Sequence, residues 1–354
     1  MELLEYLQDN TPVNDNFIPR KCMLPQSGYI NLYGARGTGK SALVLNHIKQ
    51  FDKKNILYID MDDPNLLFNP LQELQQYIKQ NDIKLLILDH FDNKDIKLPK
   101  VDNLIVVSRE PCNMMNFNSM ELLPLDYEEF LAFENHIVQT NAFTHFLKSG
   151  ALPMMAKVHK SHQSILKQFI QSRFDIQELK LFVILAEHHT EHLSVNQIYS
   201  FAKEKFKISK DWLYTAIKSF QYEGLVYFID DISKKGGKKL IIYDTAVAKY
   251  LTFKHSFMMQ FDSTIAMTLI KQNKHFETLG IHGYVTDDFT LVIPAPFDSE
   301  EGMWAKSQKK FSIYKRHGIK KVMIITVANQ YEFNIENIVF EALPFYEWSI
   351  TDEI

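Results

Sequence analysis

One short segment constrains the fold of this chain more than any other. It reads Gly34-Ala35-Arg36-Gly37-Thr38-Gly39-Lys40-Ser41 and fits the pattern GxxxxGK[ST] at every fixed position. An apolar run at residues 29–33 comes directly before it, and a helical pattern at residues 42–50 follows directly. A glycine-rich turn between a buried strand and a helix is typical of a phosphate-binding loop, or P-loop. The segment therefore predicts an α/β fold with a parallel sheet.

Each residue type in this loop has a physical task. Glycines allow the tight curl that turns backbone N–H groups toward phosphate oxygens, and the N-terminal end of the helix favours the anion. We expect Lys40 to reach the β- and γ-phosphates of a nucleotide and the Ser41 hydroxyl to bind Mg²⁺. The alternative is a glycine-rich turn without a ligand. We predict ATP and Mg²⁺ as ligands, with the nucleotide held by Gly34, Ala35, Arg36, Gly37, Thr38, Gly39, Lys40, Ser41 and Ala42.

Three further apolar runs, at residues 56–60, 85–89 and 104–107, alternate with helical segments. Continuous apolar runs suit strands buried on both faces of a parallel sheet. The second run ends on Asp89, where P-loop enzymes place an acid near Mg²⁺, so we predict Asp89 and Ser41 as metal ligands. The alternative role for Asp89 is to cap the next segment. Asp60 offers a second polar group at the same edge of the sheet.

The pattern changes character after residue 124, first to helices and then to a mixture of helix and strand that includes a predicted helix at residues 263–280. Three helical patterns followed by two strands around a loop at 230–239 indicate a winged helix. The fold class is α/β: a P-loop NTPase parallel sheet with a helical lid, then a winged helix, then a small α/β domain. The expected boundaries are 1–137, 138–174, 175–250 and 251–354.

Composition says more about where the protein is located than about what it binds. A formal net charge of −4 and a pI near 6.4 do not indicate a global nucleic-acid or membrane binder. Cys22 and Cys112 form no CxxC pair, so a cysteine-based metal site is not supported. No run approaches the ~20 apolar residues of a membrane-spanning helix. We expect a soluble, cytoplasmic protein that does not contact a membrane, and the sequence leaves its oligomeric state open.

Two segments after the predicted sheet carry a family resemblance. Residues 121–131 read Glu-Leu-Leu-Pro-Leu-Asp-Tyr-Glu-Glu-Phe-Leu, and residues 150–153 read Gly-Ala-Leu-Pro. With the P-loop, they resemble the L-x-P-L-(S/D)-x-x-E-F segment and the G-G-x-P turn of prokaryotic AAA-type ATPases with a C-terminal winged helix and a nuclease-like domain. The resemblance implies a restriction-endonuclease-like fold for residues 251–354. It also implies that Ser108 is the polar sensor of the γ-phosphate.

The chain departs from that family where water would be activated. The usual Asp-Glu pair reads Asp89-His90, so the second carboxylate is missing, although a histidine can orient a water. Asp92 substitutes only if the following loop turns it back. We therefore assign catalytic roles, if there is catalysis, to Asp89, His90 and Ser108.

The family's Gly-Arg pair, a candidate arginine finger, is also missing and reads Asn118-Ser119-Met120. Arg36 and Arg109 are nearby basic residues, but nothing in the sequence places either on the γ-phosphate. Because an arginine finger accelerates turnover ~10³-fold or more, we predict a nucleotide-dependent switch with slow or absent ATP hydrolysis. A working ATPase with unusual catalytic residues is the alternative.

The densest basic cluster lies in the predicted winged helix. A helix flanked by a basic wing can contact a DNA groove and its phosphates, whereas a solvated hairpin on a protein-contact module is the plainer reading. DNA or a protein is therefore the predicted partner, and a second hypothesis is a DNA-binding regulator in which ATP is structural. The nucleic-acid candidates are Lys210, Lys218, Lys234, Lys235, Lys238 and Lys239.

The C-terminal region lacks the residues of an active nuclease. Such sites need two acids and a Glu-x-Lys to hold Mg²⁺ and activate water. Glu277 and Asp288 are candidates for the two acids, but Ile293-Pro294-Ala295-Pro296 stands where Glu-x-Lys is expected. We predict an inactive remnant, with an active nuclease as the third hypothesis. Three histidines, at 188, 189 and 192, suggest zinc, but no acid or cysteine completes such a site.

Overall fold

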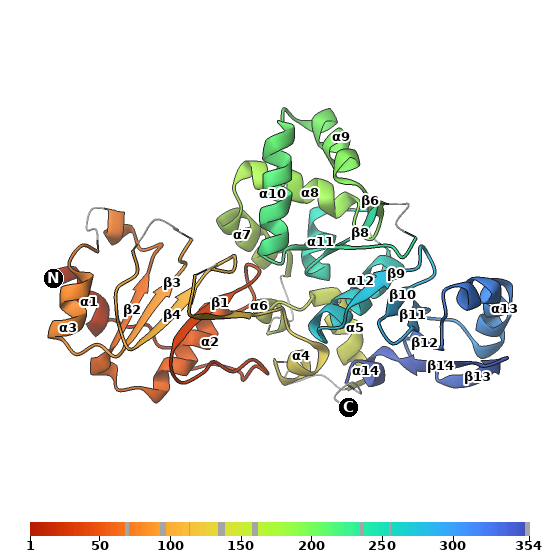
Figure 1. Ribbon diagram of the computed structural model, residues 1–354, viewed down its shortest axis with the longest axis horizontal. Helices are drawn as coiled ribbons and strands as arrows, with labels where there is room; N and C mark the ends of the chain where they lie inside the picture. The colour runs from red at the N-terminus through yellow and green to blue at the C-terminus, as the bar shows by residue number, and fades with distance from the viewer. Residues whose placement is uncertain are drawn as a thin grey trace. The chain divides into compact units, whose positions relative to one another are not determined.

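The computed structural model describes residues 1–67, 71–92, 97–112, 114–133, 139–157, 162–233, 237–254 and 256–350. The chain divides into two compact units, coloured along the sequence in Figure 1. Unit 1 comprises Met1–Pro124 and the short segment Tyr222–Leu225, and unit 2 comprises Leu125–Gln221 and Val226–Ile354. The four domain boundaries expected from the sequence remain predictions.

Unit 1 is built on a five-stranded parallel sheet with the strand order β2-β3-β4-β1-β5 (Figure 1). The first four strands coincide with the four apolar runs of the sequence. The fifth was not predicted, because Phe-Asn-Ser-Met-Glu is a largely exposed edge strand with no continuous apolar run. The strands are β1 (Tyr29–Tyr33), β2 (Ile56–Asp60), β3 (Leu85–Asp89), β4 (Asn103–Val107) and β5 (Phe117–Glu121).

Hydrophobic cores cover both faces of this sheet, as continuous apolar strands require. In β3, Leu85 and Ile87 join one core, while Leu86 and Leu88 join the other. The alternation follows from the two-residue period of a strand. The helices of unit 1 are α1 (Glu2–Asp9), α2 (Lys40–His47) and α3 (Leu74–Gln80), with short 3₁₀ helices η1 (Ile48–Gln50), η2 (Lys53–Asn55) and η3 (Pro64–Leu67).

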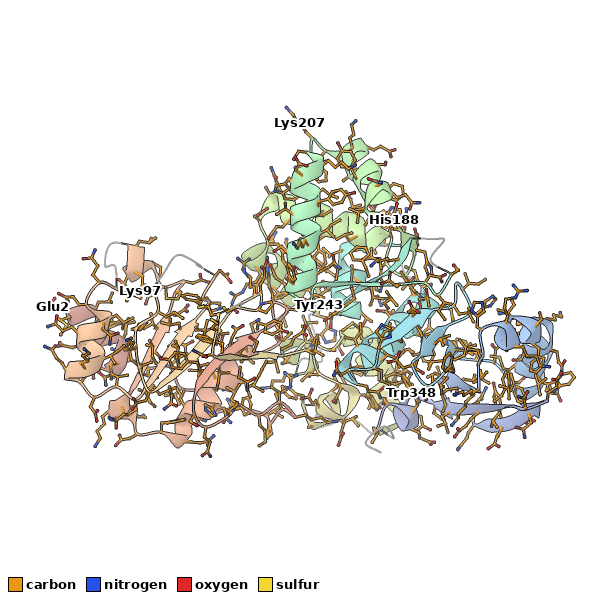
Figure 2. All side chains as sticks on the ribbon, viewed as in Figure 1. Glu2, Lys97, His188, Lys207, Tyr243 and Trp348 are labelled. Carbon is orange, nitrogen blue, oxygen red and sulfur yellow. The ribbon has the colours of Figure 1, made fainter. Side chains whose placement is uncertain are left out.

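The first part of unit 2 is helical and ends in a small sheet. Asp175 and Ser194 form capping boxes that start α8 and α9, and Ser209 accepts a hydrogen bond from the Trp212 N–H at the start of α10. The antiparallel sheet has the order β6-β8-β7. Figure 2 labels Lys207 between α9 and α10. The elements are α4 (Tyr127–Phe133), α5 (Gln139–Ser149), α6 (Pro153–Ala156), α7 (His162–Arg173), α8 (Ile176–Glu187), β6 (His192–Leu193), α9 (Val195–Lys205), α10 (Lys210–Tyr222), β7 (Val226–Ile229), β8 (Lys238–Ile242) and α11 (Thr245–Leu251).

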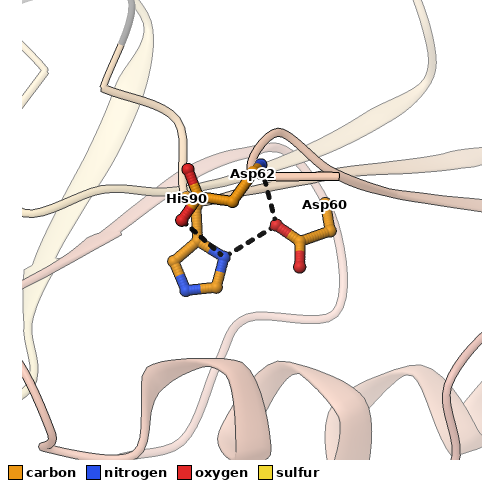
Figure 3. Close-up of side chains that lie close together, drawn as sticks. All are labelled: Asp60, Asp62 and His90. Atoms are coloured by element: carbon orange, nitrogen blue, oxygen red, sulfur yellow. Dashed lines mark hydrogen bonds and ion pairs between the residues drawn. The ribbon is translucent and has the colours of Figure 1, made fainter. Parts of the chain in front are cut away.

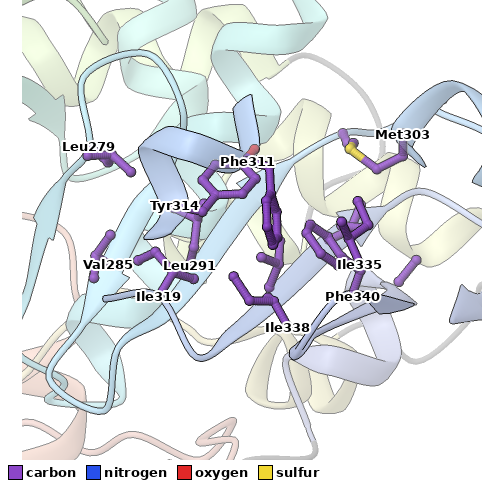
Figure 4. Packing of buried hydrophobic residues seen from close by; sticks show 14 residues of the cluster. Leu279, Val285, Leu291, Met303, Phe311, Tyr314, Ile319, Ile335, Ile338 and Phe340 are labelled. Atoms are coloured by element: carbon purple, nitrogen blue, oxygen red, sulfur yellow. The ribbon is translucent and has the colours of Figure 1, made fainter. Parts of the chain in front are cut away.

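The second part of unit 2 contains a six-stranded mixed sheet with the order β13-β14-β12-β11-β10-β9. Leu291, Val322 and Phe340 from three of its strands pack with Phe311 and Tyr314 of α13 in one core (Figure 4). The helix expected at 263–280 is wrong at its C-terminal end, because α12 stops at Lys271 and β9 begins at Phe276. The elements are α12 (Phe257–Lys271), β9 (Phe276–Thr278), β10 (Tyr284–Thr286), β11 (Thr290–Pro294), α13 (Glu300–Arg316), β12 (Lys321–Thr326), β13 (Tyr331–Ile335), β14 (Ile338–Pro344) and α14 (Phe345–Trp348).

Among the described residues, no helix combines the length and the apolar character needed to cross a bilayer.

Candidate nucleotide-binding site

The glycine-rich segment forms the connection between β1 and α2. Gly34 adopts a φ of 136°, and a Cβ at this position would lie 2.7 Å from the backbone carbonyl oxygen of Leu122. Only glycine therefore lets the loop pass so close to the segment after β5. Gly39 adopts the left-handed conformation at the N-cap of α2, and no side chain caps the helix there. The first N–H groups of α2 thus remain available to an anion.

The Lys40 side chain is folded back over this loop. Its Nζ donates hydrogen bonds to the carbonyl oxygens of Gly34 at 2.7 Å and Ala35 at 3.0 Å. The Thr38 hydroxyl donates to the same Ala35 oxygen at 3.0 Å. An ammonium held by neutral carbonyls can exchange them for phosphate oxygens, which form stronger, charge-assisted hydrogen bonds.

Arg20 holds the P-loop through backbone carbonyl groups, and no sequence pattern predicts this contact. Its guanidinium donates to the carbonyl oxygen of Thr38 at 2.9 Å and to that of Leu123 at 2.8 Å. It therefore connects the P-loop to the segment that follows β5. Two backbone carbonyls far apart in sequence leave no pattern by which Arg20 could be found.

Asp89 lies at the end of β3 with its side chain fully buried. The Tyr58 hydroxyl donates to one carboxylate oxygen at 2.5 Å, and the N–H of His90 donates to the other at 2.9 Å. Burial, followed by the charge of Asp89, raises the pKa of Tyr58 well above its usual value, so Tyr58 remains a donor. The contact with His90 resembles the local capping role considered from the sequence, while Tyr58 is a partner that the sequence did not identify.

His90, directly after β3, lies close to two acids at the end of β2, Asp60 and Asp62 (Figure 3). Its Nδ1 lies 2.8 Å from an oxygen of Asp60 and 3.9 Å from one of Asp62. The hydrogen bond to Asp60 raises the pKa of His90 despite its partial burial, and the nearby carboxylates add to this effect. The three side chains offer ligand atoms within 4.8 Å of one another. A cation would have to displace the His90–Asp60 contact, which already explains the arrangement.

Ser108, the expected sensor, follows β4 directly and is 4% exposed. Its hydroxyl donates to the carbonyl oxygen of Glu110 at 2.6 Å and accepts from Asn31 Nδ2 at 2.8 Å. The Asn31 carbonyl oxygen in turn accepts from the N–H of Cys112 at 2.7 Å. Asn31 thus orients Ser108. The feature of the sequence that could have indicated this role is a single amide side chain within an apolar strand.

Both arginines near the loop are engaged with carboxylates. The Arg36 guanidinium makes two contacts with Glu223, Nε at 2.9 Å and Nη2 at 3.0 Å, and the two side chains are 4% and 2% exposed. The Nε of Arg109 lies 2.6 Å from a carboxylate oxygen of Asp92, and its Nη1 lies 3.9 Å from one of Glu223. Asp92, considered as a substitute catalytic acid, therefore neutralises Arg109. Glu223 comes from far along the chain, so sequence reasoning missed it.

The lysines proposed to contact nucleic acid lie in different surroundings. Lys239 is 9% exposed, lies 2.6 Å from Asp262 and has its ammonium 4.6 Å from the ring centre of Tyr284. Lys238 pairs with Asp230 at 3.0 Å. Lys210 and Lys218 lie on α10, with the Lys210 ammonium 5.7 Å from the ring centre of Tyr214. Lys234 and Lys235 lie outside the described residues.

The acids proposed for a nuclease site have separate surroundings. Glu277 lies in β9, whereas Asp288 lies in the turn between β10 and β11. The Asp288 carboxylate accepts from the Thr286 hydroxyl at 2.5 Å and from the Thr290 N–H and hydroxyl at 3.2 and 3.0 Å. Burial acts to raise the pKa of Asp288, but these hydrogen bonds lower it. Asp288 thus closes its own turn.

The three clustered histidines also have separate partners. His188 stacks on Phe201 and contacts Glu191, while the buried His189 accepts the N–H of Ile242 at 3.1 Å. His192 contacts the Thr278 hydroxyl at 3.0 Å. These contacts favour structural roles over a shared zinc ion.

The P-loop, Asp89 and Ser108 thus lie at the carboxyl edge of one parallel sheet, where α/β proteins bind ligands. Residues 26–115 match a family model described as an AAA domain. The matched segment contains β1 to β4 and α2, and with them Lys40, Asp89, His90 and Ser108.

Other similar proteins match longer parts of the chain. An uncharacterised protein of Methanocaldococcus jannaschii is 24% identical over 272 residues, covering 64% of this chain and 60% of that protein. The chain therefore spans less than two thirds of that relative's length. A Walker-type ATPase of Pyrococcus abyssi is 12% identical, with 63% of this chain and 90% of that chain covered and a TM-score of 0.43. The Orc1 protein of Aeropyrum pernix, solved in complex with DNA, is 11% identical, with 64% and 87% covered and a TM-score of 0.30.

Proposed function

We propose that this protein binds ATP with Mg²⁺ and uses the nucleotide as a switch, with slow or weak hydrolysis. The observation that carries the proposal is the buried Arg36–Glu223 ion pair, which joins the P-loop to the segment Tyr222–Leu225. Arg36 occupies a variable position of the loop, beside the place where phosphates bind. A triphosphate brings negative charge to that place and competes with Glu223 for the guanidinium.

Nucleotide binding is supported by the loop itself. Its backbone curl, the uncapped start of α2 and the ammonium of Lys40 supply N–H groups and positive charge at one point. The oxygen ligands that Mg²⁺ prefers are available in the Ser41 hydroxyl and the Asp89 carboxylate. Tyr58 occupies one lone pair of Asp89 and orients the carboxylate, so the residues present fit the ion. Bound Mg²⁺ would neutralise phosphate charge and orient the nucleotide.

Slow hydrolysis is supported by the groups that surround the expected water position. His90 stands where the family has a carboxylate, and the contact of its Nδ1 with Asp60 at 2.8 Å engages one of the two ring nitrogens that could accept a proton from water. Arg36 and Arg109 are both neutralised by carboxylates, so neither is a ready arginine finger. Ser108 remains the proposed sensor, because Asn31 holds its hydroxyl at the end of β4.

The switch signal is proposed to travel through Glu223. In sequence, Tyr222–Leu225 lies between α10 and β7, so a change at Glu223 acts directly on the ends of both elements. Gly224, with a φ of 72°, adopts the left-handed conformation that commonly follows the end of a helix. Releasing Glu223 from Arg36 alters the end of α10 without requiring any change in the sheet.

Hydrogen exchange tests this switch directly. Amides of residues 222–229 are expected to change their exchange rate when ATP and Mg²⁺ are added to the wild type, but not to Lys40→Ala. Lys79→Ala, a change of an exposed lysine on α3, serves as the matched control and should respond like the wild type. Unchanged exchange in a wild-type sample shown to be saturated with ATP would refute the switch.

We also propose that α8, α9, α10 and the β6-β8-β7 sheet form a winged helix that serves as a structural connector. Asp231, at the base of the wing, accepts hydrogen bonds from the Thr278 hydroxyl at 3.0 Å and the Gly280 N–H at 2.7 Å. Lys239 is likewise committed to Asp262. The wing is thus attached to β9 and α12, which favours protein contact over the alternative of DNA binding.

The remaining part of unit 2 is proposed to be a degenerate restriction-endonuclease-like domain. A helix followed by three strands, a helix and a further strand supports this assignment. The Asp288 carboxylate accepts a hydrogen bond within its own turn, and Pro294 ends β11. Among the described residues, the metal ligands and the lysine of a nuclease are therefore not assembled here. Mg²⁺-dependent DNA cleavage that Asp288→Ala abolishes would reverse this assignment.

A further inference from the structure

A cavity of about 520 Å³ lies within unit 2, and its lining includes no P-loop residue. Its walls come from α12, α13, the turn between β9 and β10, the end of β11 and the edge of the small sheet. On α13, Met303, Lys306, Lys310 and Tyr314 contribute, and their spacing places them on one face of the helix. Figure 4 shows Met303 and Tyr314 at this helix. The volume suits a small organic ligand.

The charges around the cavity do not balance. Lys239 pairs with Asp262 at 2.6 Å, and Lys306 contacts both oxygens of Asp298 at 2.7 and 2.9 Å. Lys310 also lines the cavity, and within the described part of the chain it has no carboxylate partner. Three ammonium groups therefore face two carboxylates, which leaves one positive charge.

Two histidines in the wall do not change this balance. Burial lowers the pKa of His282, and the charge of Lys310 lowers it further. Burial and Lys239 lower the pKa of His192 in the same way, against the opposite effect of Asp231 and Asp262. Both imidazoles therefore favour the neutral form. Moreover, the Nδ1 of His282 is buried and has no hydrogen-bond partner among the residues that the structure describes, so this wall holds unsatisfied polar capacity beside Lys310.

The mouth of the cavity is apolar and exposed to an unusual degree. Ile281 is 92% exposed and Phe297 is 70% exposed, and both line the cavity. Phe297 packs against Phe257 with ring centres 5.1 Å apart, and Met258 is 46% exposed. Apolar side chains grouped at the entrance of a polar cavity indicate a ligand with an apolar body.

We propose that this cavity binds a small organic monoanion, a carboxylic acid with an aliphatic or aromatic body. The carboxylate pairs with Lys310, and the apolar body lies against Ile281 and Phe297. The single excess positive charge selects a monoanion over a more highly charged phosphate, because each further negative charge would enter a partly buried site without a partner. The site is independent of the nucleotide site.

A fluorescent monoanion, 8-anilinonaphthalene-1-sulfonate, tests the site in the full-length protein without nucleotide. We expect saturable binding to one site, weakened roughly tenfold or more by Lys310→Met, because a charged contact is lost. Lys309→Met removes a neighbouring exposed charge on the same helix and should bind like the wild type. The uncharged analogue N-phenyl-1-naphthylamine should bind the wild type about tenfold more weakly. Equal affinity for the two dyes, or for Lys310→Met and wild type, would overturn the proposal.

Two further arms define the ligand and its position. Ile281→Asp, at the exposed mouth, should abolish dye binding while the thermal unfolding curve stays that of the wild type; retained binding would place the dye elsewhere. Decanoate and 1-naphthoate should displace the dye, and their order of affinity separates an aliphatic from an aromatic body. Displacement by a single-stranded oligonucleotide, but by neither acid, would overturn the assignment to a small carboxylic acid.

Discussion

The five-stranded sheet and the six-stranded sheet each carry an aspartate beside a strand, and the two aspartates differ in what surrounds them. Asp89 ends β3, fully buried, with Tyr58 holding one oxygen and the P-loop at the same sheet edge. Asp288 precedes β11, and Thr286 and Thr290 use its carboxylate to close a turn. An acid beside a strand therefore becomes a candidate ligand only where other elements bring phosphate- or metal-binding groups to the same edge.

The largest effect is expected from the group that distinguishes the P-loop edge. Lys40→Ala should weaken ATP binding by roughly a hundredfold or more, because a charge-assisted contact to the phosphates is lost. A fluorescent ATP analogue titrated against wild type, Lys40→Ala and the control Lys79→Ala measures the change. Equal affinity for all three would place the nucleotide elsewhere.

A second test concerns the buried ion pair that we propose links the loop to α10. Glu223→Gln removes the carboxylate charge that contacts the buried Arg36 guanidinium at two points and should lower the free energy of unfolding by ~3 kcal/mol. Urea denaturation without nucleotide measures this loss. The double variant Arg36→Met with Glu223→Gln should recover part of the stability; no recovery would show that the two side chains do not act as a pair.

ATP should partly compensate for the loss of Glu223, since the phosphates supply negative charge near Arg36. The stability gain on adding ATP and Mg²⁺ is therefore expected to be larger for Glu223→Gln than for wild type. A gain that is equal or smaller would disconnect Arg36 from the nucleotide and remove the proposed route of the switch.

The comparison of the two aspartates is sharpened by changing Asp89. Asp89→Asn should weaken ATP binding about tenfold when Mg²⁺ is present and much less when EDTA is present, because an amide is a poorer ligand for Mg²⁺ than a carboxylate. Titrations in the two buffers separate the metal-dependent part. An equal loss in both buffers would indicate that Asp89 only supports the end of β3.

The smallest effect is expected at Asp288. Asp288→Asn should leave ATP binding unchanged and reduce the free energy of unfolding by ~1 kcal/mol, because the turn loses charge-assisted hydrogen bonds. The pKa of Asp288 is lowered in the folded state, so its stabilising effect is present above its usual value of 3.8 and is lost as the pH falls below it. The stability difference between wild type and variant should therefore shrink below about pH 4. A difference that grows on acidification would contradict this role.

Much of the first sheet could be predicted because its information is local. Continuous apolar runs define β1 to β4, and the motif between residues 34 and 41 fixes the first crossover. The edge strand β5 was not predicted, because exposed polar residues such as Asn118 do not indicate a strand. Tyr58, Arg20 and Glu223 escaped for another reason: each acts through a partner distant in sequence. Pair contacts of this kind appear only after the chain has folded.

The six-stranded sheet was harder to predict, because short strands separated by turns show only weak hydrophobic periodicity. Residues 276–278 and 284–286 form β9 and β10, yet each strand has only three residues. The helical pattern that begins in α12 was extended through β9, since Gln272 and Asn273 give only a mild stop signal. Asp288 accepts a hydrogen bond from Thr290 within its own turn, and the inactive nuclease-like domain stays a prediction.

Single-turnover analysis of ATP on the protein tests the central claim most directly. Wild type is mixed with radiolabelled ATP and Mg²⁺, the mixture is quenched at intervals, and ATP and ADP are separated while released phosphate is counted. We expect stoichiometric binding, with conversion to ADP far slower than the ~10 per second of a typical enzyme. Conversion at or above that rate would contradict a switch governed by bound nucleotide and would indicate a working ATPase.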